Sequence, residues 1–352
     1  MNALTGKYCL NIFNNEMYIF YACSCKIDKI KFNIFLVYVI VLFVLRIHDL
    51  VKKHEVIHVK HLHDLFDAVK KRDKSTVAVA CADDVHVLEA VGGAKSFAQF
   101  ILVGDASKIN AVATTAQVDI QGIQIIHEPD AAKACAAAVS LVAGGDAQAL
   151  MKGLVDTGVI LKAVLNKEAG MRTENMLSHL AVFELPTYHK LFFVTDAAMN
   201  IAPDFDGLKC IIHNAVAAVN ALGIKTPKVA LLAAKEKSDP KMPVTIEYDK
   251  LVAMHKDGGI INCILDGPLA LDNAVSSESA QIKGIVSDVA GDADILICPD
   301  IEAGNILYKS LAFLASGKNG GVLLGAKRPI ILTSRADSSE SKLISIALGL
   351  LS

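Results

Sequence analysis

The chain has 352 residues, more than one hydrophobic core usually supports, so we expect two lobes with a core each. Its formal net charge of -2 and its pI near 6.6 provide no broad field of one sign, and no basic run is interleaved with aromatic residues. Nucleic acid is therefore not an expected partner.

The cysteines indicate a reducing compartment. Eight are scattered along the chain, and only Cys23 and Cys25 lie close together. Their spacing predicts neither a disulfide framework nor a C-x-x-C metal site. We expect reduced thiols, a cytoplasmic location and no bound metal.

Residues 1–55 differ in composition from the rest of the chain. They are rich in Asn, Ile, Phe, Lys and Tyr, whereas the sequence after Thr76 is dense in Ala, Val, Gly and Asp. Their uninterrupted apolar run at 34–45 is shorter than the roughly 20 residues of a spanning helix. Three interpretations stay open: a signal or membrane anchor, a soluble extension, or upstream DNA translated from a start codon assigned too early. A membrane is an expected partner only under the first.

Helices and strands alternate in the rest of the chain. An amphipathic helix is expected around Leu62, Leu65 and Val69, and apolar runs predict strands at 76–81, 100–103 and 123–127, with helices after Asp84 and at 131–142. The same pattern predicts strands at 191–195, 229–233, 295–298 and 329–333. This alternation is typical of a parallel α/β sheet, in which functional residues follow the carboxyl ends of strands.

Prolines punctuate the middle of the chain, and we place lobe boundaries near Tyr188 and Gly320. The predicted organisation is an atypical N-terminal segment at 1–55, a first α/β lobe at 56–187 and a second α/β lobe at 188–319. Residues 320–352 are predicted to return to the first lobe.

The sharpest candidate site follows the predicted strand 329–333, where Ser334 and Arg335 immediately precede a helix. A helix N-terminus carries unpaired N–H groups and partial positive charge. A hydroxyl and a guanidinium at that point favour a phosphate or a developing oxyanion. The structural alternative is that Asp337 caps the helix and Glu340 completes a capping box.

Two other strand ends carry polar residues. Asp300, Gly304, Asn305 and Lys309 follow the strand 295–298, and Gly304 would permit the protein backbone to approach a ligand closely. Asp196 and Asn200 follow the strand 191–195. The structural alternatives are an ordinary capped helix with a solvated lysine, and a turn stabilised by Asp and Asn.

Several well-known motifs are missing from the sequence. It contains no G-x-x-x-x-G-K-[ST], no G-x-G-x-x-G after a strand, no G-x-S-x-G and no H-E-x-x-H. Kinases, Rossmann-type enzymes, hydrolases and zinc proteases therefore lose support. The histidines at 54, 58, 61 and 63 straddle the composition break, and we interpret them as incidental.

Taken together, these segments make residues 56–352 resemble the phosphate acetyl/butyryltransferase family. The matching motifs are D-x-x-x-N-x-x-P from Asp196, D-G-P-L-A-L-D-N-A from Asp266, P-D-x-x-A-G-N-x-x-Y-K from Pro299, and Ser334-Arg335. The sequence K-M-P at 241–243, the run 266–274 and the stretch 334–337 are more similar to the butyryl branch of the family than to the acetyl branch.

The resemblance implies a two-lobed parallel-sheet sandwich like that of isocitrate and isopropylmalate dehydrogenases, with the active site between the lobes and homo-oligomers built on dimers. It implies an acyltransferase that exchanges the coenzyme A of a short acyl-CoA, with butyryl favoured, for inorganic phosphate. The reaction would use a ternary complex, with CoA as substrate and no permanently bound cofactor. Phosphate acetyltransferase is the alternative. An NAD-dependent dehydrogenase is a remote one, because the metal-binding aspartates that it requires are not found at matching positions.

The resemblance also implies roles for individual residues. Ser334 would stabilise the reacting centre and Arg335 would hold phosphate, with Arg172 as a candidate second phosphate-binding arginine. The other expected substrate-binding residues are Asp196, Asn200, Asp300, Gly304, Asn305 and Lys309.

The chain departs from the family at one acidic position. Acetyltransferases of the family carry an acidic pair six and seven residues after the serine, and the second is proposed as the base for the CoA thiol. Here these positions are Glu340 and Ser341. Because a free thiol has a pKa of about 8 to 9, we expect some assistance at neutral pH: either Glu340 or Asp337 serves as the base, or the mechanism differs from that of the family.

Overall fold

The computed structural model describes residues 7–13, 16–22, 59–334 and 337–352, and the chain forms two compact units, 1–55 and 56–352. In the first unit, β1 (Lys7–Phe13) and β2 (Glu16–Ala22) pair as an antiparallel hairpin. The apolar run at 34–45 lies outside the described residues, so the interpretations of the N-terminal segment stay predictions. None of the described helices is long and apolar enough to cross a membrane.

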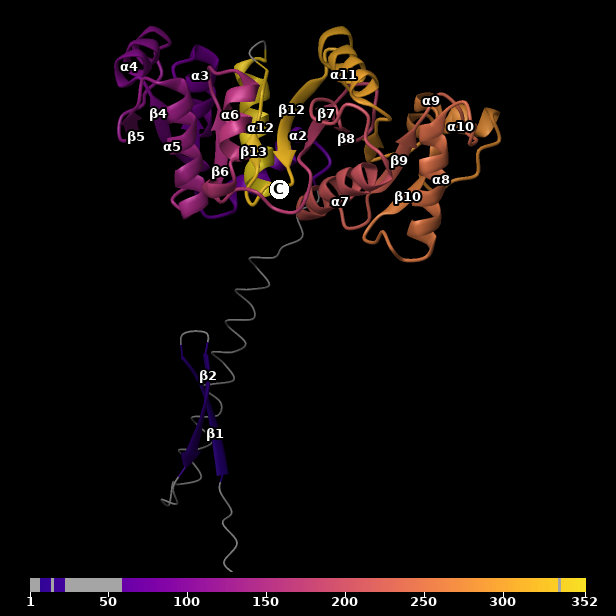
Figure 1. Cartoon of the computed structure of the whole chain (residues 1–352), viewed down its shortest axis with the longest axis horizontal. Helices are drawn as coiled ribbons and strands as arrows, with labels where there is room; N and C mark the ends of the chain where they lie inside the picture. Colours follow the sequence, from indigo (N-terminus) through magenta and orange to yellow (C-terminus); the bar gives the residue numbers. More distant parts are fainter. Residues whose placement is uncertain (1–6, 14–15, 23–58, 335–336) are drawn as a thin grey trace, which may run out of the picture. The chain divides into compact units, whose positions relative to one another are not determined.

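The described part of the second unit contains an eleven-stranded sheet of order β10-β9-β11-β8-β7-β12-β13-β6-β3-β4-β5. Its strands are β3 (Ser75–Ala80), β4 (Ala98–Gly104), β5 (Gln124–His127), β6 (Ala149–Lys152), β7 (Ser178–Glu184), β8 (Phe192–Thr195), β9 (Lys228–Leu232), β10 (Ile264–Leu269), β11 (Ile295–Ile297), β12 (Lys318–Leu324) and β13 (Ile330–Ile331). We call β6, β3, β4 and β5 the first half of the sheet, β8, β11, β9 and β10 the second half, and β7, β12 and β13 the central strands (Figure 1).

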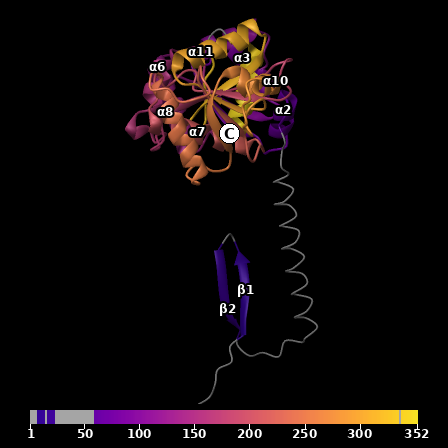
Figure 2. The ribbon, with the colours of Figure 1, turned by 90° about the vertical axis from the view of Figure 1, so that its right-hand side faces the viewer.

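Helices lie around both faces of this sheet (Figure 2). They are α2 (Leu62–Lys70), α3 (Val85–Ala94), α4 (Ala106–Thr115), α5 (Ala131–Gly144), α6 (Thr157–Val164), α7 (Phe205–Ala221), α8 (Pro243–Lys256), α9 (Leu271–Val275), α10 (Ser277–Ile282), α11 (Ile301–Lys309) and α12 (Ser339–Leu351), with short 3₁₀ and π segments at Lys167–Ala169 and Ser310–Leu314.

The α/β fold class is confirmed, but the sheet is mixed rather than wholly parallel. All seven predicted strands are present, as β3, β4, β5, β8, β9, β11 and β13, with ends shifted by at most two residues. Strand β7 runs antiparallel to both β8 and β12, and β12 runs antiparallel to β13. The sequence analysis missed β7 and β12, together with β6 and β10. In β12 the pair Gly320-Gly321 weakens the strand signal.

The two faces of the sheet differ in how their cores are organised. On one face, alternate side chains such as Val79 of β3 and Leu180 of β7 enter a single core that is shared by both halves. On the other face the first half packs with α5 and α6, and the second half forms a separate core around Phe183 and Val194. On this face the central strands contribute Leu323 and Ile330 to the first of these cores and Ala181 and Phe183 to the second, and the buried polar side chain of His179 lies on the same face of β7.

Candidate active site

At the predicted Ser334 site, two hydrogen bonds join Ser334 to Asp337 ahead of α12. The Ser334 N–H donates to Asp337 Oδ2 at 2.7 Å, and the Asp337 N–H donates to the Ser334 carbonyl at 3.2 Å. Ser334 is exposed and Asp337 is half-buried, while Arg335 lies outside the described residues. The serine is therefore at the surface, four residues before the N-cap of α12.

The capping alternative for this segment is wrong, because the cap is one residue later than expected. The N-cap of α12 is Ser338, whose Oγ accepts from the Ser341 N–H at 3.1 Å. Asp337 is thereby left to bond to Ser334 instead of the helix. No capping box forms with Glu340.

Glu340 lies on the first turn of α12 and forms an ion pair across the surface. Its Oε1 is 2.8 Å from the Nζ of Lys318 at the start of β12, and the two side chains are 57% and 56% exposed. The hydrogen bond with Glu340 and its charge raise the pKa of Lys318. An exposed pair of this kind contributes about 0–1 kcal/mol to stability, so its loss is tolerable.

A buried lysine that the sequence analysis missed lies beneath the turn. Lys342 is 3% exposed, and its Nζ donates to the carbonyls of Ser334 and Asp337. The signal in the sequence is its spacing, since Lys342 precedes the buried Ser345, Ile346 and Gly349 by three, four and seven residues and so falls on the inward face of α12.

The loop after β8 is held by the two polar residues predicted there. Asp196 is 3% exposed, and its Oδ1 accepts from the N–H groups of Ala198 and Met199 at 2.8 and 3.0 Å. The Asn200 amide donates to Asp196 Oδ2 at 2.6 Å and to the Leu177 carbonyl at 2.9 Å. These contacts match the turn-stabilising alternative for Asp196 and still leave Asn200 beside a cavity.

Helix α11 packs directly on the same loop. Asp300 caps the helix by accepting from the Ala303 N–H at 2.8 Å, and Asn305 Nδ2 donates to the Ala197 carbonyl at 3.1 Å. A Cβ at Gly304 would lie 2.1 Å from the Asp196 carbonyl oxygen. The close approach that Gly304 permits is thus to the chain itself. Lys309 is exposed at the last position of α11.

Gly304→Ala is expected to lower the melting temperature strongly, because the added Cβ overlaps backbone and either α11 or the Asp196 loop must move. Overpacking of this kind typically costs about 1–3 kcal/mol and occasionally more. The matched control is Gly158→Ala in α6, where a Cβ meets nothing within 4 Å. Thermal unfolding should show a large decrease for the first variant and no decrease for the second. Equal melting temperatures would contradict the contact.

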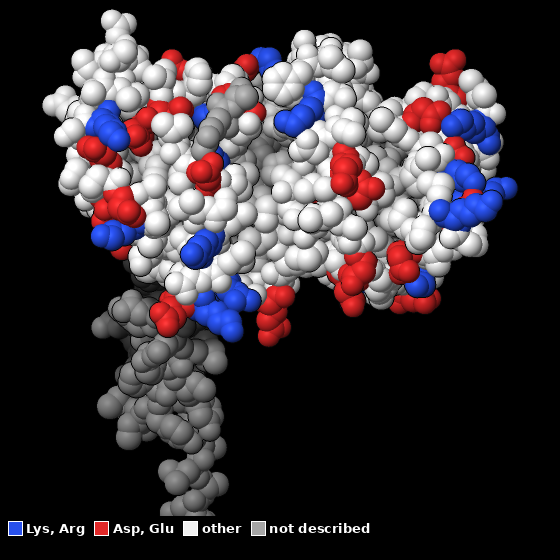
Figure 3. Space-filling view, turned by 45° about the horizontal axis from the view of Figure 1, so that its top comes forward, with Lys and Arg blue, Asp and Glu red and all other residues white. Residues whose placement is uncertain are grey.

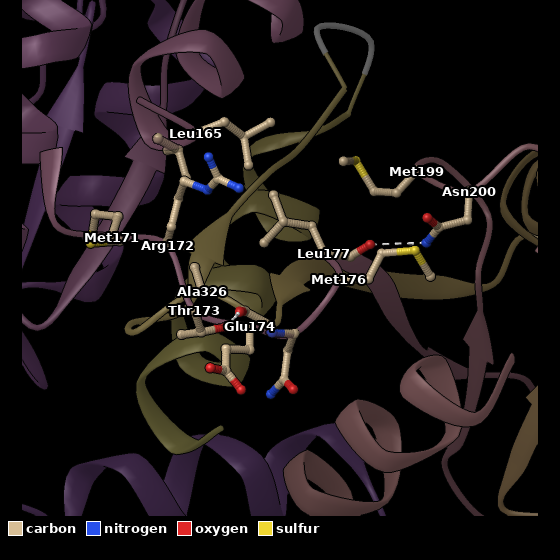
Figure 4. A pocket seen from close by; sticks show the side chains of 13 residues that line it. Leu165, Met171, Arg172, Thr173, Glu174, Met176, Leu177, Met199, Asn200 and Ala326 are labelled. Atoms are coloured by element: carbon tan, nitrogen blue, oxygen red, sulfur yellow. Dashed lines mark hydrogen bonds between the residues drawn. The ribbon is translucent and has the colours of Figure 1, made fainter. Parts of the chain in front are cut away.

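Arg172 and Asn200 line one cavity between the two halves of the sheet. The cavity measures about 410 Å³ and is lined by Val164, Leu165, Met171, Arg172, Thr173, Glu174, Asn175, Met176, Leu177, Met199, Asn200, Gly325 and Ala326. Figure 4 shows the Arg172 side chain across the cavity from Met199 and Asn200. The Thr173 hydroxyl donates to the Gly325 carbonyl and ties the cavity floor to the end of β12. Within the described residues, the lining does not include Ser334.

His179 of β7 lies between the loop after β8, which contains Asp196, and the segment that contains Ser334 and Asp337. It is 5% exposed, stacks edge-on against Tyr308 and sits over Gly321, and its Nδ1 has no hydrogen-bond partner among the described residues. Burial lowers the pKa of His179, and the charges of Asp196 and Asp337 oppose that shift without overcoming it. The histidine is therefore a neutral group that faces both acidic loops. It was missed because β7 was missed.

A second and larger cavity of about 760 Å³ lies in the second half of the sheet. Asp300, Cys298 and Leu307 line it, together with Met242 and Pro243 of the K-M-P sequence. It opens at the carboxyl ends of β9 and β11, where the following connections leave in opposite directions along the sheet. Such switch points commonly hold ligands in α/β sheets.

The face of the molecule in Figure 3 carries no large patch of a single charge sign. On the face that Figure 3 shows, Lys and Arg side chains are interspersed with Asp and Glu. The five cysteines in the described part of the chain are free thiols, and four of them are buried. Among the described residues, no group of three or more His, Cys, Asp or Glu side chains could hold a metal ion.

Comparison with known proteins gives consistent matches. Residues 131–350 match the family model described as "Phosphate acetyl/butaryl transferase". The chain is 45% identical to the phosphate butyryltransferase of Clostridium acetobutylicum over 295 residues, which cover 83% of this chain and 98% of that protein. It is also 45% identical to the phosphate butyryltransferase of Clostridium beijerinckii over 294 residues, with 83% and 97% covered. Among solved structures, a branched-chain phosphotransacylase from Enterococcus faecalis V583 is similar with a TM-score of 0.70 and 37% identity, covering 79% of this chain and 98% of that one.

Proposed function

The chain belongs to the phosphate acetyl/butyryltransferase family, and from this membership we propose that it transfers a short acyl group between coenzyme A and inorganic phosphate. The reaction is acyl-CoA + phosphate = acyl phosphate + CoA. Butyryl is the favoured acyl group, because relatives that are 45% identical over nearly their whole length are phosphate butyryltransferases. CoA takes part as a substrate, and no permanently bound cofactor is required.

The observation that carries the proposal is the Ser334 turn. Its serine is exposed four residues before the N-cap of α12, and its backbone is held by hydrogen bonds to Asp337 and Lys342. A hydroxyl carried on a held backbone is suited to a developing oxyanion, since that backbone does not have to be organised during the reaction.

The proposed chemistry is one displacement at the thioester carbon. A phosphate oxygen attacks the carbonyl carbon, the carbon–sulfur bond breaks, and CoA leaves as a thiolate that then takes up a proton. The Ser334 hydroxyl donates to the carbonyl oxygen as negative charge develops on it. Arg335 and Arg172 hold the phosphate through charge-assisted hydrogen bonds.

An acidic side chain near the turn is proposed to move the proton of the CoA thiol. Glu340 is the proposed base, because its exposed carboxylate is accessible to a substrate that arrives from solvent. Asp337 is the second candidate. Asp337 accepts a hydrogen bond from the Ser334 N–H, so its carboxylate lies close to the serine. The same bond means that Asp337 also holds the serine backbone in place.

The remaining predicted residues are proposed to shape and line the substrate site. Asn200 lines the cavity with Arg172, and Lys309 is exposed and can meet a CoA phosphate group. The loop after β8 is held in place by contacts of Asp196, Asp300, Gly304 and Asn305, and we propose that these four residues contribute by positioning this loop. We further propose homo-oligomers built on dimers, a cytoplasmic location, and lobe boundaries near Tyr188 and Gly320.

The acyl preference is tested by measuring CoA release from acetyl-CoA, butyryl-CoA and branched acyl-CoAs in the presence of phosphate. One methylene in an apolar pocket changes kcat/KM by about 10–200-fold, so butyryl-CoA should exceed acetyl-CoA by at least about tenfold. A higher kcat/KM for acetyl-CoA would instead assign the chain to the phosphate acetyltransferases of the family.

A further inference from the structure

Lys342 is a buried lysine whose side chain reaches the backbone of Ser334 and Asp337. Its Nζ donates to the Asp337 carbonyl at 2.8 Å and to the Ser334 carbonyl at 3.1 Å, so one ammonium group holds both ends of the turn. The side chain is 3% exposed, and the lysine sits on the second turn of α12. These two hydrogen bonds connect Ser334 and Asp337 to the buried face of α12.

Burying an ammonium group lowers the stability of the fold, so a buried lysine is best explained by a role at the site. Taking an ammonium group out of water costs several kcal/mol, and an apolar side chain would serve better if only the packing of α12 mattered. Burial lowers the pKa of Lys342, while the carboxylates of Asp337 and Asp84 act in the opposite direction. The cation is thus compensated by carbonyl dipoles and by two acidic groups from different segments.

The peptide geometry shows what the lysine does to the turn. In a planar trans peptide, the carbonyl and the following N–H point in opposite directions. Because the Asp337 carbonyl faces Lys342, the N–H of Ser338 points away from that lysine. The Ser334 N–H and carbonyl are both engaged with Asp337, which fixes the backbone that carries the serine hydroxyl.

We propose that Lys342 is a positioning residue for acyl transfer, which holds the carbonyls of Ser334 and Asp337 from the inside so that the Ser334 hydroxyl faces the reacting centre. The inference rests on the proposed function, since it assigns a role within that reaction. Lys342 acts through the turn and does not itself touch the substrates.

The test compares Lys342→Met and Lys342→Gln with the wild type. Met keeps the buried stem and removes the donors and the charge, whereas Gln keeps a donor that can reach one carbonyl. Losing positioned donors costs about 10²–10³ in kcat where they act fully, so we expect kcat to fall at least about tenfold in Gln and further in Met. KM for acyl-CoA should change by less than about threefold, and KM for phosphate should rise. Lys250→Met, at a lysine 57% exposed on α8, is the matched control and should behave as wild type.

A second readout does not depend on catalysis. Inorganic phosphate should raise the melting temperature of the wild type and of Lys250→Met, and should raise that of the Lys342 variants less. Unchanged kcat and an unchanged phosphate-dependent shift in Lys342→Gln would overturn the proposal, even if Lys342→Met fails to fold. If the wild type itself released no CoA, the proposed function would fail, while the thermal comparison would still decide whether Lys342 holds the phosphate-binding turn.

Discussion

Ser334→Ala is expected to lower kcat for acyl transfer by about 100-fold or more, because the substitution removes one donor aimed at the developing oxyanion. KM for acyl-CoA and for phosphate should stay within roughly threefold, since the interaction strengthens only in the transition state. The backbone of the turn should persist, as the Ser334 N–H and carbonyl keep their bonds to Asp337 and Lys342. Steady-state kinetics with both substrates varied provides the measurement.

The control for this variant is Ser338→Ala in the same segment. Ser338 caps α12 through its hydroxyl, so its loss should cost about 0.5–2 kcal/mol of stability. Its kcat should remain close to that of the wild type. The roles of the two serines would be reversed if Ser338→Ala lost turnover while Ser334→Ala kept it.

Glu340→Gln is expected to cut CoA-dependent turnover by about 100-fold or more, since an amide cannot accept the thiol proton. The melting temperature should hardly change, because the carboxylate makes an exposed ion pair with Lys318 that contributes about 0–1 kcal/mol. The reaction is followed from acyl phosphate and CoA to acyl-CoA, the direction in which the thiol must lose its proton.

Two further variants separate the carboxylate from its neighbours. Lys318→Gln breaks the same ion pair and keeps Glu340, so its turnover should be near normal. Asp337→Asn should have a smaller effect than Glu340→Gln, because the Asn oxygen still accepts the Ser334 N–H. Near-normal turnover in Glu340→Gln together with a collapse in Asp337→Asn would make Asp337 the base.

Strands with strong local patterns could be predicted from the sequence. The strands predicted at 76–81 and 229–233 appear as β3 and β9 with ends moved by one residue, because a buried apolar run that ends at a turn has few other structures open to it. Strand β12 could not be predicted in this way, since its first four residues, Lys-Asn-Gly-Gly, are typical of a turn. What makes it a strand is its pairing with β7 over seven residues, a non-local contact.

The candidate site shows the same division between local and non-local information. Ser334 was predicted because its strand, serine and helix are consecutive in the sequence. The roles of Gly304 and His179 were not predicted, because Gly304 meets the Asp196 carbonyl from a distant segment and His179 depends on the register of β7. The cap at Ser338 rather than Asp337 was a local ambiguity, since either residue type caps a helix well.

The most direct measurement of the central claim is CoA release from butyryl-CoA with and without inorganic phosphate, together with the amount of butyryl phosphate formed. We expect that release requires phosphate, that one butyryl phosphate forms for each CoA, and that initial-rate lines for the two substrates intersect, as a ternary complex requires. CoA release without phosphate, or parallel lines that indicate an acyl-enzyme, would contradict this expectation.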